Sequence, residues 1–169
     1  AYAAVGYFRF RDGNSVRVSL ALAKSKVAPV KMLSIPRLEL EAAKLGARLA
    51  KSIAELHSFE IAKRFFLSDS RCVLQWISST KFDFVPFVAH RVSEILELTA
   101  ASEWFYVPTN ENVADDATKI QRRTDDEARS RWFNGPQFLV NPSDKWPTER
   151  VHKERDDEVM LNLHSNVSC

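Results

Sequence analysis

The stretch SIPRLELEAAKLGARLAKSIAELH, residues 34–57, decides how the rest of the chain is interpreted. Ser34 can cap the N-terminus of a helix, and Pro36 suits a first helical turn. Apolar side chains then recur at about 100° per residue, the period of an α-helix. The pattern predicts one long amphipathic helix, whose apolar stripe is Leu38, Ala42, Leu45, Leu49, Ile53 and Leu56.

Charged residues on this predicted helix gather opposite the apolar stripe, at Lys44, Arg48, Lys51 and Glu55. Glu39 belongs to neither set. It projects on a flank of small residues, made of Ala43, Gly46 and Ala50. Small neighbours leave room for a bulky group, so this flank is the side on which we expect something to approach Glu39.

A β-hairpin is predicted before the helix. Residues 2–10 alternate small and aromatic side chains, and residues 16–23 place apolar side chains at every second position. Asp12-Gly13-Asn14 between them is a strong turn signal. Three lysines, Lys24, Lys26 and Lys31, surround the exit of the hairpin.

After the helix, strands and helices alternate. Residues 61–67 and 103–107 have the composition of short strands, and residues 72–77 and 85–95 that of helices. A short helix is expected to begin at Asp115 after a polar loop. This order predicts an α/β fold with helices packed on a mixed sheet. We divide the chain into a domain over residues 1–122, an irregular extension over 123–148 and a charged linker or tail over 149–169.

Composition excludes several classes of protein. The 169 residues are 45% apolar and 27% charged, which suits one folded domain rather than a disordered chain. The formal net charge of +2 neither demands nor excludes a nucleic-acid partner. Cys72 and Cys169 make neither a disulfide framework nor a zinc motif, and no apolar run is long enough for a membrane span. We expect an intracellular protein, in a cytoplasmic particle or the nucleus, that is a piece of a longer chain.

Three acidic residues occupy positions where a metal site can form: Glu39 in the first turns of the long helix, Asp69 at a strand end and Asp115 at the start of the last helix. Carboxylate oxygens are the ligands that Mg²⁺ prefers. Each residue also has an ordinary interpretation, because acids are favoured at helix N-termini and aspartate is a common helix cap. Taken one at a time, the three acids leave both interpretations open.

Several motifs, in their residues and in their order along the chain, resemble those of the ribonuclease H domain of Bel/Pao-type retrotransposon polyproteins. The resemblance spans residues 2–147 and rests on these segments: SIPRLELEAA at 34–43, FLSDSR at 66–71 with VLQWI at 73–77, FVAHRV at 87–92, WFYVPTNENVAD at 104–115 and WFNGP at 132–136.

The resemblance implies a five-stranded mixed sheet with flanking helices and a nuclease that cuts the RNA strand of RNA–DNA hybrids with two Mg²⁺ or Mn²⁺ ions. Carried over residue by residue, the metal-binding and catalytic acids are Glu39, Asp69 and Asp115, with Glu41 and Asp116 as lower-ranked alternatives. The implied partners are the hybrid and the reverse transcriptase and integrase regions of the same polyprotein, and no membrane.

One feature of the family has no counterpart in this sequence. The family's first aspartate lies on an opening strand, a few residues before the position of Ala1, and Asp12 in the hairpin turn cannot replace it. We therefore expect a ribonuclease H-like sheet without its first strand, and hydrolysis that is weak or absent in this chain.

Phosphate contacts dominate the binding of nucleic acids, so basic residues near the acids are candidates for substrate binding: Lys24, Lys26, Lys31, Arg37 and Arg71. Each of them can equally be a solvated charge.

A non-catalytic nucleic-acid-binding or structural module, from a degraded or domesticated element, is the alternative to a nuclease. The lack of the first aspartate favours it, and the survival of three acids in matching contexts opposes it. An integrase-type nuclease requires another spacing of acids. An aspartic protease is excluded because the sequence contains no Asp-Thr-Gly or Asp-Ser-Gly triplet.

Overall fold

The computed structural model of the chain describes residues 1–80, 83–118 and 126–151. Its strands are β1 (Tyr2–Asp12), β2 (Ser15–Lys26), β3 (Phe66–Ser68) and β4 (Trp104–Tyr106). Its α-helices are α1 (Ile35–Leu56), α2 (Arg71–Ser78), α3 (Pro86–Leu98) and α4 (Asp126–Asn134). Short 3-10 turns follow β4, of which η3 (Val113–Ala117), η4 (Gln137–Val140) and η5 (Ser143–Lys145) matter below.

The predicted hairpin is present. β1 pairs antiparallel with β2 from Tyr2 opposite Lys26 to Asp12 opposite Ser15, with an irregularity in the register between Gly6 and Tyr7. Gly13 in the turn has a φ of 56°, a conformation that glycine adopts without steric cost.

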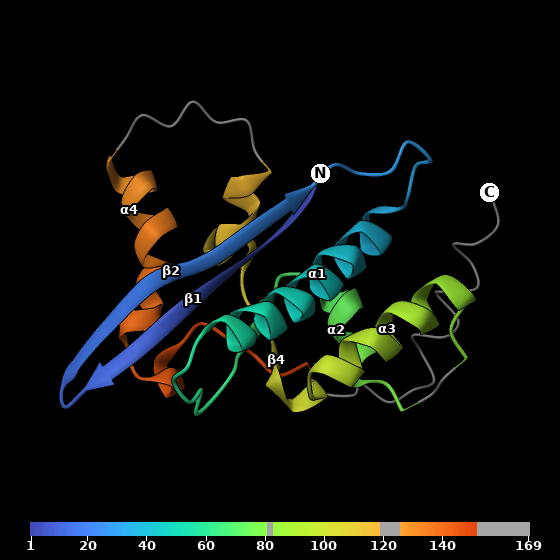
Figure 1. The fold of residues 1–169 in the computed structure, drawn as a ribbon. Coiled ribbons are helices and arrows are strands. Elements are labelled where there is room, and N and C mark those ends of the chain that lie inside the picture. The colour runs from blue at the N-terminus through green and yellow to red at the C-terminus, as the bar shows by residue number, and fades with distance from the viewer. Residues whose placement is uncertain (81–82, 119–125, 152–169) are drawn as a thin grey trace.

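α1 confirms the predicted long helix, but its burial differs from the expected single stripe. The helix lies between β1 on one side and α3 on the other (Figure 1), so two of its faces are covered. Leu40, Ala43 and Ala47 join the core with α2 and α3, whereas Leu45, Leu49 and Ile53 join the core with the hairpin. Leu56, expected to be buried, is 73% exposed.

The flank of small residues on α1 packs inside the protein and does not receive a bulky ligand. Ala43 is buried in the core with α2 and α3, and Ala50 packs against the same core. Gly46 faces β1, where an added Cβ atom would lie 3.8 Å from the Cβ of Ala4. At Gly6 the approach is closer still, because an added Cβ would come within 2.5 Å of Cδ1 of Ile53. The expectation of an open side next to Glu39 was therefore wrong for this flank.

The described strands form two small sheets instead of one five-stranded sheet. β1 pairs only with β2, and β3 pairs in parallel with β4, with Phe66 opposite Trp104 and Ser68 opposite Tyr106. β3 is shorter than the predicted 61–67, because residues 62–65 are exposed and pair with no strand. The architecture is nevertheless a mixed α/β fold, compatible with a ribonuclease H-like domain.

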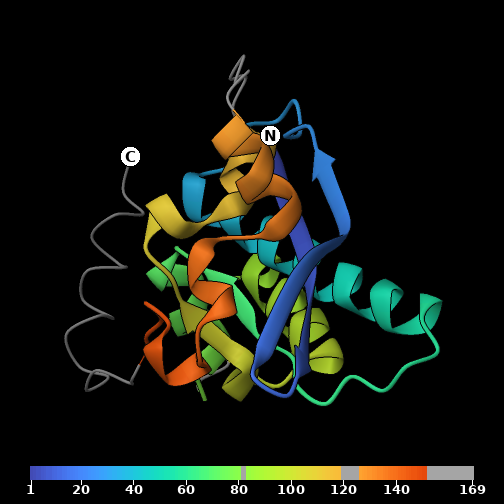
Figure 2. The ribbon, with the colours of Figure 1, turned by 90° about the vertical axis from the view of Figure 1, so that its left-hand side faces the viewer.

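The segment after α4 covers the side of the strands opposite α1. Phe138, Leu139, Trp146 and Val107 form a buried cluster on which Tyr7, Val18 and Leu67 pack, so it contacts β1, β2 and β3 together. Figure 2 shows this segment running alongside the hairpin. The phenol of Tyr7 donates to the carbonyl of Trp132 at 2.7 Å, and Nε of Arg9 donates to that of Leu139 at 2.7 Å.

Parts of the sequence interpretation fall outside the described residues, namely much of the loop at 81–83, the approach to α4 and nearly all of the predicted tail. Among the described residues, the helices are too short or too polar to cross a membrane.

Candidate functional site

Glu39 lies in the first turns of α1 and is half-buried. The hydroxyl of Ser70 donates a hydrogen bond of 2.6 Å to its Oε2. Ser70 is buried and is also the N-cap of α2, where its hydroxyl accepts from the amide of Val73 at 3.3 Å. One serine therefore fixes the Glu39 carboxylate relative to the start of α2.

Asp69 follows β3 directly, and its Oδ1 accepts a hydrogen bond of 2.9 Å from Nδ2 of Asn112. Asn112 is the N-cap of η3, where its Oδ1 accepts from the amide of Ala114 at 3.2 Å. Because β3 and β4 are parallel, the residues that follow them emerge at the same edge of their sheet, which brings Asn112 to Asp69.

Asp115 belongs to the first turn of η3, and its amide donates to the carbonyl of Asn112 at 3.3 Å. The predicted acids therefore lie on three neighbouring elements that two polar side chains connect. Ser70, the residue after Asp69, is hydrogen-bonded to Glu39, and Asn112, the cap of the turn that contains Asp115, is hydrogen-bonded to Asp69. The described residues contain no group of three acids, histidines or cysteines close enough to bind one metal ion.

The capping roles that the sequence left open for Asp69 and Asp115 belong to their neighbours. Ser70, not Asp69, caps α2, and Asn112, not Asp115, caps η3. Sequence reasoning missed both residues as parts of the site. Their signal was available, because serine and asparagine just before a helical turn are typical caps.

Ser34 occupies the N-cap position of α1 as predicted, but its side chain makes no capping hydrogen bond there.

The two lower-ranked acids take part in ion pairs between elements. Glu41 is buried, and its carboxylate contacts Nζ of Lys44 at 2.6 Å and Nε of Arg91 on α3 at 2.8 Å. Burial disfavours the ionised form of Glu41, but the hydrogen bonds from Lys44 and Arg91 outweigh it and lower its pKa. Asp116 pairs with Arg131 of α4 at 3.6 Å.

Cys72 is a further group next to Glu39 that the sequence did not single out. Burial, and to a smaller extent the charge of Glu39, raise the pKa of its thiol to about 11. The thiol is therefore protonated at neutral pH and is a poor nucleophile or metal ligand there.

The candidate substrate residues differ in their surroundings. Lys24 and Lys26 are exposed at the end of β2, toward the start of α1. The Arg37 guanidinium lies 5.2 Å from the ring centroid of Phe87. That of Arg71 lies 3.9 Å from the ring centroid of Tyr106 and pairs with Glu149.

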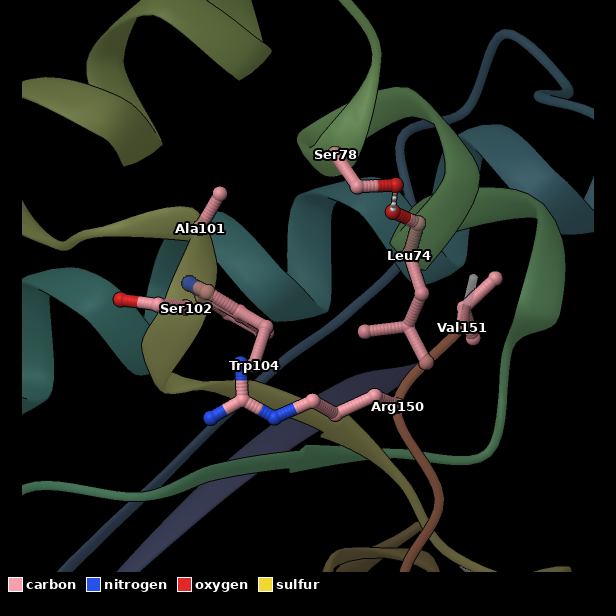
Figure 3. A pocket seen from close by; sticks show the side chains of 7 residues that line it. All are labelled: Leu74, Ser78, Ala101, Ser102, Trp104, Arg150 and Val151. Carbon is pink, nitrogen blue, oxygen red and sulfur yellow. Dashed lines mark hydrogen bonds between the residues drawn. The ribbon is translucent and has the colours of Figure 1, made fainter. Parts of the chain in front are cut away.

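A cavity of about 300 Å³ lies between α2 and β4, where Arg150 points toward Trp104 (Figure 3). Its lining is Leu74, Ser78, Ala101, Ser102, Trp104, Arg150 and Val151, so none of the predicted acids takes part in it.

Residues 1–70 match the family described as Pao retrotransposon-like RNaseH-like domain. The predicted resemblance is thereby confirmed. The match to the Pao-type domain covers β1, β2, α1 and β3, with Glu39 and Asp69, and stops before Asp115. No curated protein and no solved structure matches the chain.

Proposed function

We propose that this chain is the ribonuclease H domain of a Pao-type retrotransposon polyprotein, which hydrolyses the RNA strand of RNA–DNA hybrids. The observation that carries the proposal is the hydrogen-bonded connection of Glu39, Ser70, Asp69 and Asn112, with Asp115 in the turn that Asn112 caps. The reverse transcriptase and integrase regions of the same polyprotein are the proposed neighbours.

The donor set suits Mg²⁺ or Mn²⁺, because the predicted residues are carboxylates and hard cations prefer oxygen ligands. The described hydrogen bonds occupy Oε2 of Glu39 and Oδ1 of Asp69, which leaves the second oxygen of each carboxylate for a cation. We propose that Glu39, Asp69 and Asp115 share two cations, since among the described residues the three acids are not grouped closely enough around one ion. Such ions would supply activation of the attacking water and stabilisation of the leaving oxygen.

The chain's own residues contribute positioning. Ser70 and Asn112 orient two carboxylates by donating neutral hydrogen bonds, and both are fixed because they also cap helical turns. Ligands held in this way lose less conformational freedom when a cation binds.

A further strand, which carries the family's first aspartate, completes this proposal. β1 and β3 both pack on α1, and Tyr7 of β1 and Leu67 of β3 pack on the same cluster from the other side. The two strands therefore belong to one layer, although they are not paired with each other. We propose that the family's first strand fits between them, and that hydrolysis without it is weak or absent.

Cleavage of a labelled RNA–DNA hybrid tests the function. The chain is assayed with Mg²⁺ and with Mn²⁺, both as it is and with a family-like first strand fused ahead of Ala1, here called the strand-restored chain. We expect rapid cutting only by the strand-restored chain and its loss on Asp69→Asn. The matched control is Asp144→Asn, an exposed aspartate in η5. Cutting that survives Asp69→Asn would refute the assignment.

A non-catalytic nucleic-acid-binding or structural module is the second candidate. It is favoured by the neutral hydrogen bonds at Glu39 and Asp69, which satisfy part of each carboxylate without a cation. A folded strand-restored chain that binds the hybrid but never cuts it would support this alternative.

A further inference from the structure

Arg71 begins α2 two residues after Asp69, and its guanidinium lies over Tyr106, the last residue of β4. Its guanidinium carbon lies 3.9 Å from the ring centroid of Tyr106, so the aromatic ring holds the cation in place. The Arg71 side chain is 55% exposed, so other molecules can reach it.

Glu149 reaches the same place from the C-terminal segment. Its backbone pairs with β4 through two hydrogen bonds, from the Tyr106 amide to the Glu149 carbonyl at 2.8 Å and from the Glu149 amide to the Tyr106 carbonyl at 3.0 Å. Its Oε2 then accepts from Nη2 of Arg71 at 2.9 Å. Because the backbone bridge positions Glu149, its side chain can leave Arg71 without moving the segment.

We propose that Arg71 and Tyr106 form a binding site for a phosphodiester of a nucleic-acid strand, and that the Glu149 carboxylate takes the place of the phosphate until the strand displaces it. A guanidinium donates hydrogen bonds to carboxylate and to phosphate oxygens in the same geometry. The proposal rests on the proposed function only in that the anion belongs to a nucleic acid.

A phosphate can replace the Glu149 carboxylate because both side chains of the ion pair are exposed. Arg71 and Glu149 are 55% and 61% exposed, and ion pairs exposed to this degree are weak and sensitive to salt. A nucleic-acid strand brings several phosphates and releases bound counterions, so it competes well with one carboxylate. Glu149 thus lowers the affinity for the strand without blocking the site.

The experiment measures the dissociation constant of a labelled RNA–DNA hybrid as a function of salt, in EDTA to prevent cutting. Glu149→Gln should bind about 2–5-fold more tightly, the fold-change that corresponds to a surface ion pair. Arg71→Gln should bind more weakly, with a salt slope smaller by about 0.9. When Glu149→Gln is added to Arg71→Gln, the affinity for the hybrid should not rise.

Glu55→Gln is the matched control. Glu55 is 64% exposed and pairs with Lys51, which is 59% exposed, at 3.8 Å. It lies 16 residues after Glu39 on α1, about 24 Å along the helix axis. The control removes the same charge from a similar pair, and so measures the general electrostatic effect.

If Glu149→Gln and Glu55→Gln raise the affinity for the hybrid equally, or if the rise persists without Arg71, the inference is overturned and the proposed function still stands. If none of the variants binds the hybrid, the proposed function itself fails. Inorganic phosphate is the second probe: if Glu149→Gln binds it but gains nothing for the hybrid, the site takes free phosphate and the assignment to a nucleic-acid strand is wrong.

Discussion

At the scale of single residues, the candidate site depends on neutral side chains as much as on acids. Ser70 serves two elements at once, since it donates to Glu39 and caps α2. Sequence reasoning identified the acids from their positions in known motifs. It could not identify Ser70 as the link to Glu39, because the two residues are 31 positions apart and only the fold brings them together.

Replacing Ser70 by alanine removes both hydrogen bonds. We expect Ser70→Ala to lower the free energy of unfolding by about 1–2 kcal/mol, the usual cost of a lost helix cap in a partly buried setting. Urea denaturation measures it. Ser70→Thr keeps the hydroxyl and serves as the control, so an equal loss in both variants would show that packing, not the hydrogen bonds, is responsible.

Cys72 reports on the charge of Glu39. With a thiol pKa of about 11, Cys72 should react slowly with a disulfide reagent at pH 8 and faster as the pH approaches 11. Glu39→Gln removes a negative charge that raises this pKa, so the variant should react faster at a given pH. The rates are measured in a Cys169→Ser background. An unchanged profile in Glu39→Gln would show that Glu39 does not influence the thiol.

At the scale of elements, the sequence predicted the secondary structure that depends on residues close together in the chain. The hairpin followed from the turn at Asp12-Gly13-Asn14, and α1 from its helical period. The burial of α1 on two faces was missed, because periodicity shows one apolar stripe and cannot show that β1 fits against Gly46. β3 was predicted too long because apolar residues alone do not create a pairing partner.

The contact of Gly6 with α1 can be tested by filling it. A Cβ at Gly6 would lie 2.5 Å from Cδ1 of Ile53, so we expect Gly6→Ala to cost about 1–3 kcal/mol of stability through overpacking. Ile53→Val removes that methyl group and by itself should cost about 0.5–1.5 kcal/mol. The double variant should be more stable than the sum of the two losses predicts. Additive losses in thermal denaturation would contradict the close approach.

At the scale of the whole molecule, the C-terminal segment is a structural layer of the domain. It covers Tyr7, Val18 and Leu67 on the face opposite α1. The sequence predicted residues 123–148 as an irregular extension after a domain that ends at residue 122. Composition alone did not show which surface the extension covers.

Shortened chains test the contribution of this layer. A chain that ends at residue 122 exposes the apolar cluster on β1, β2 and β3, so we expect it to aggregate or to lose cooperative unfolding. A chain that ends at residue 151 keeps Phe138, Leu139 and Trp146 and should unfold like the full chain. Equal stability of the two shortened chains would show that residues 123–151 are dispensable for the fold.

In the proposed function, Glu39, Asp69 and Asp115 together hold divalent cations. The most direct measurement is the loss of the electron paramagnetic resonance signal of free Mn²⁺ on titration with the strand-restored chain. The proposal predicts that two ions bind, that Asp69→Asn and Asp115→Asn each abolish tight binding, and that Asp144→Asn leaves it unchanged. Binding that is equal in all four proteins would contradict a metal site at these acids.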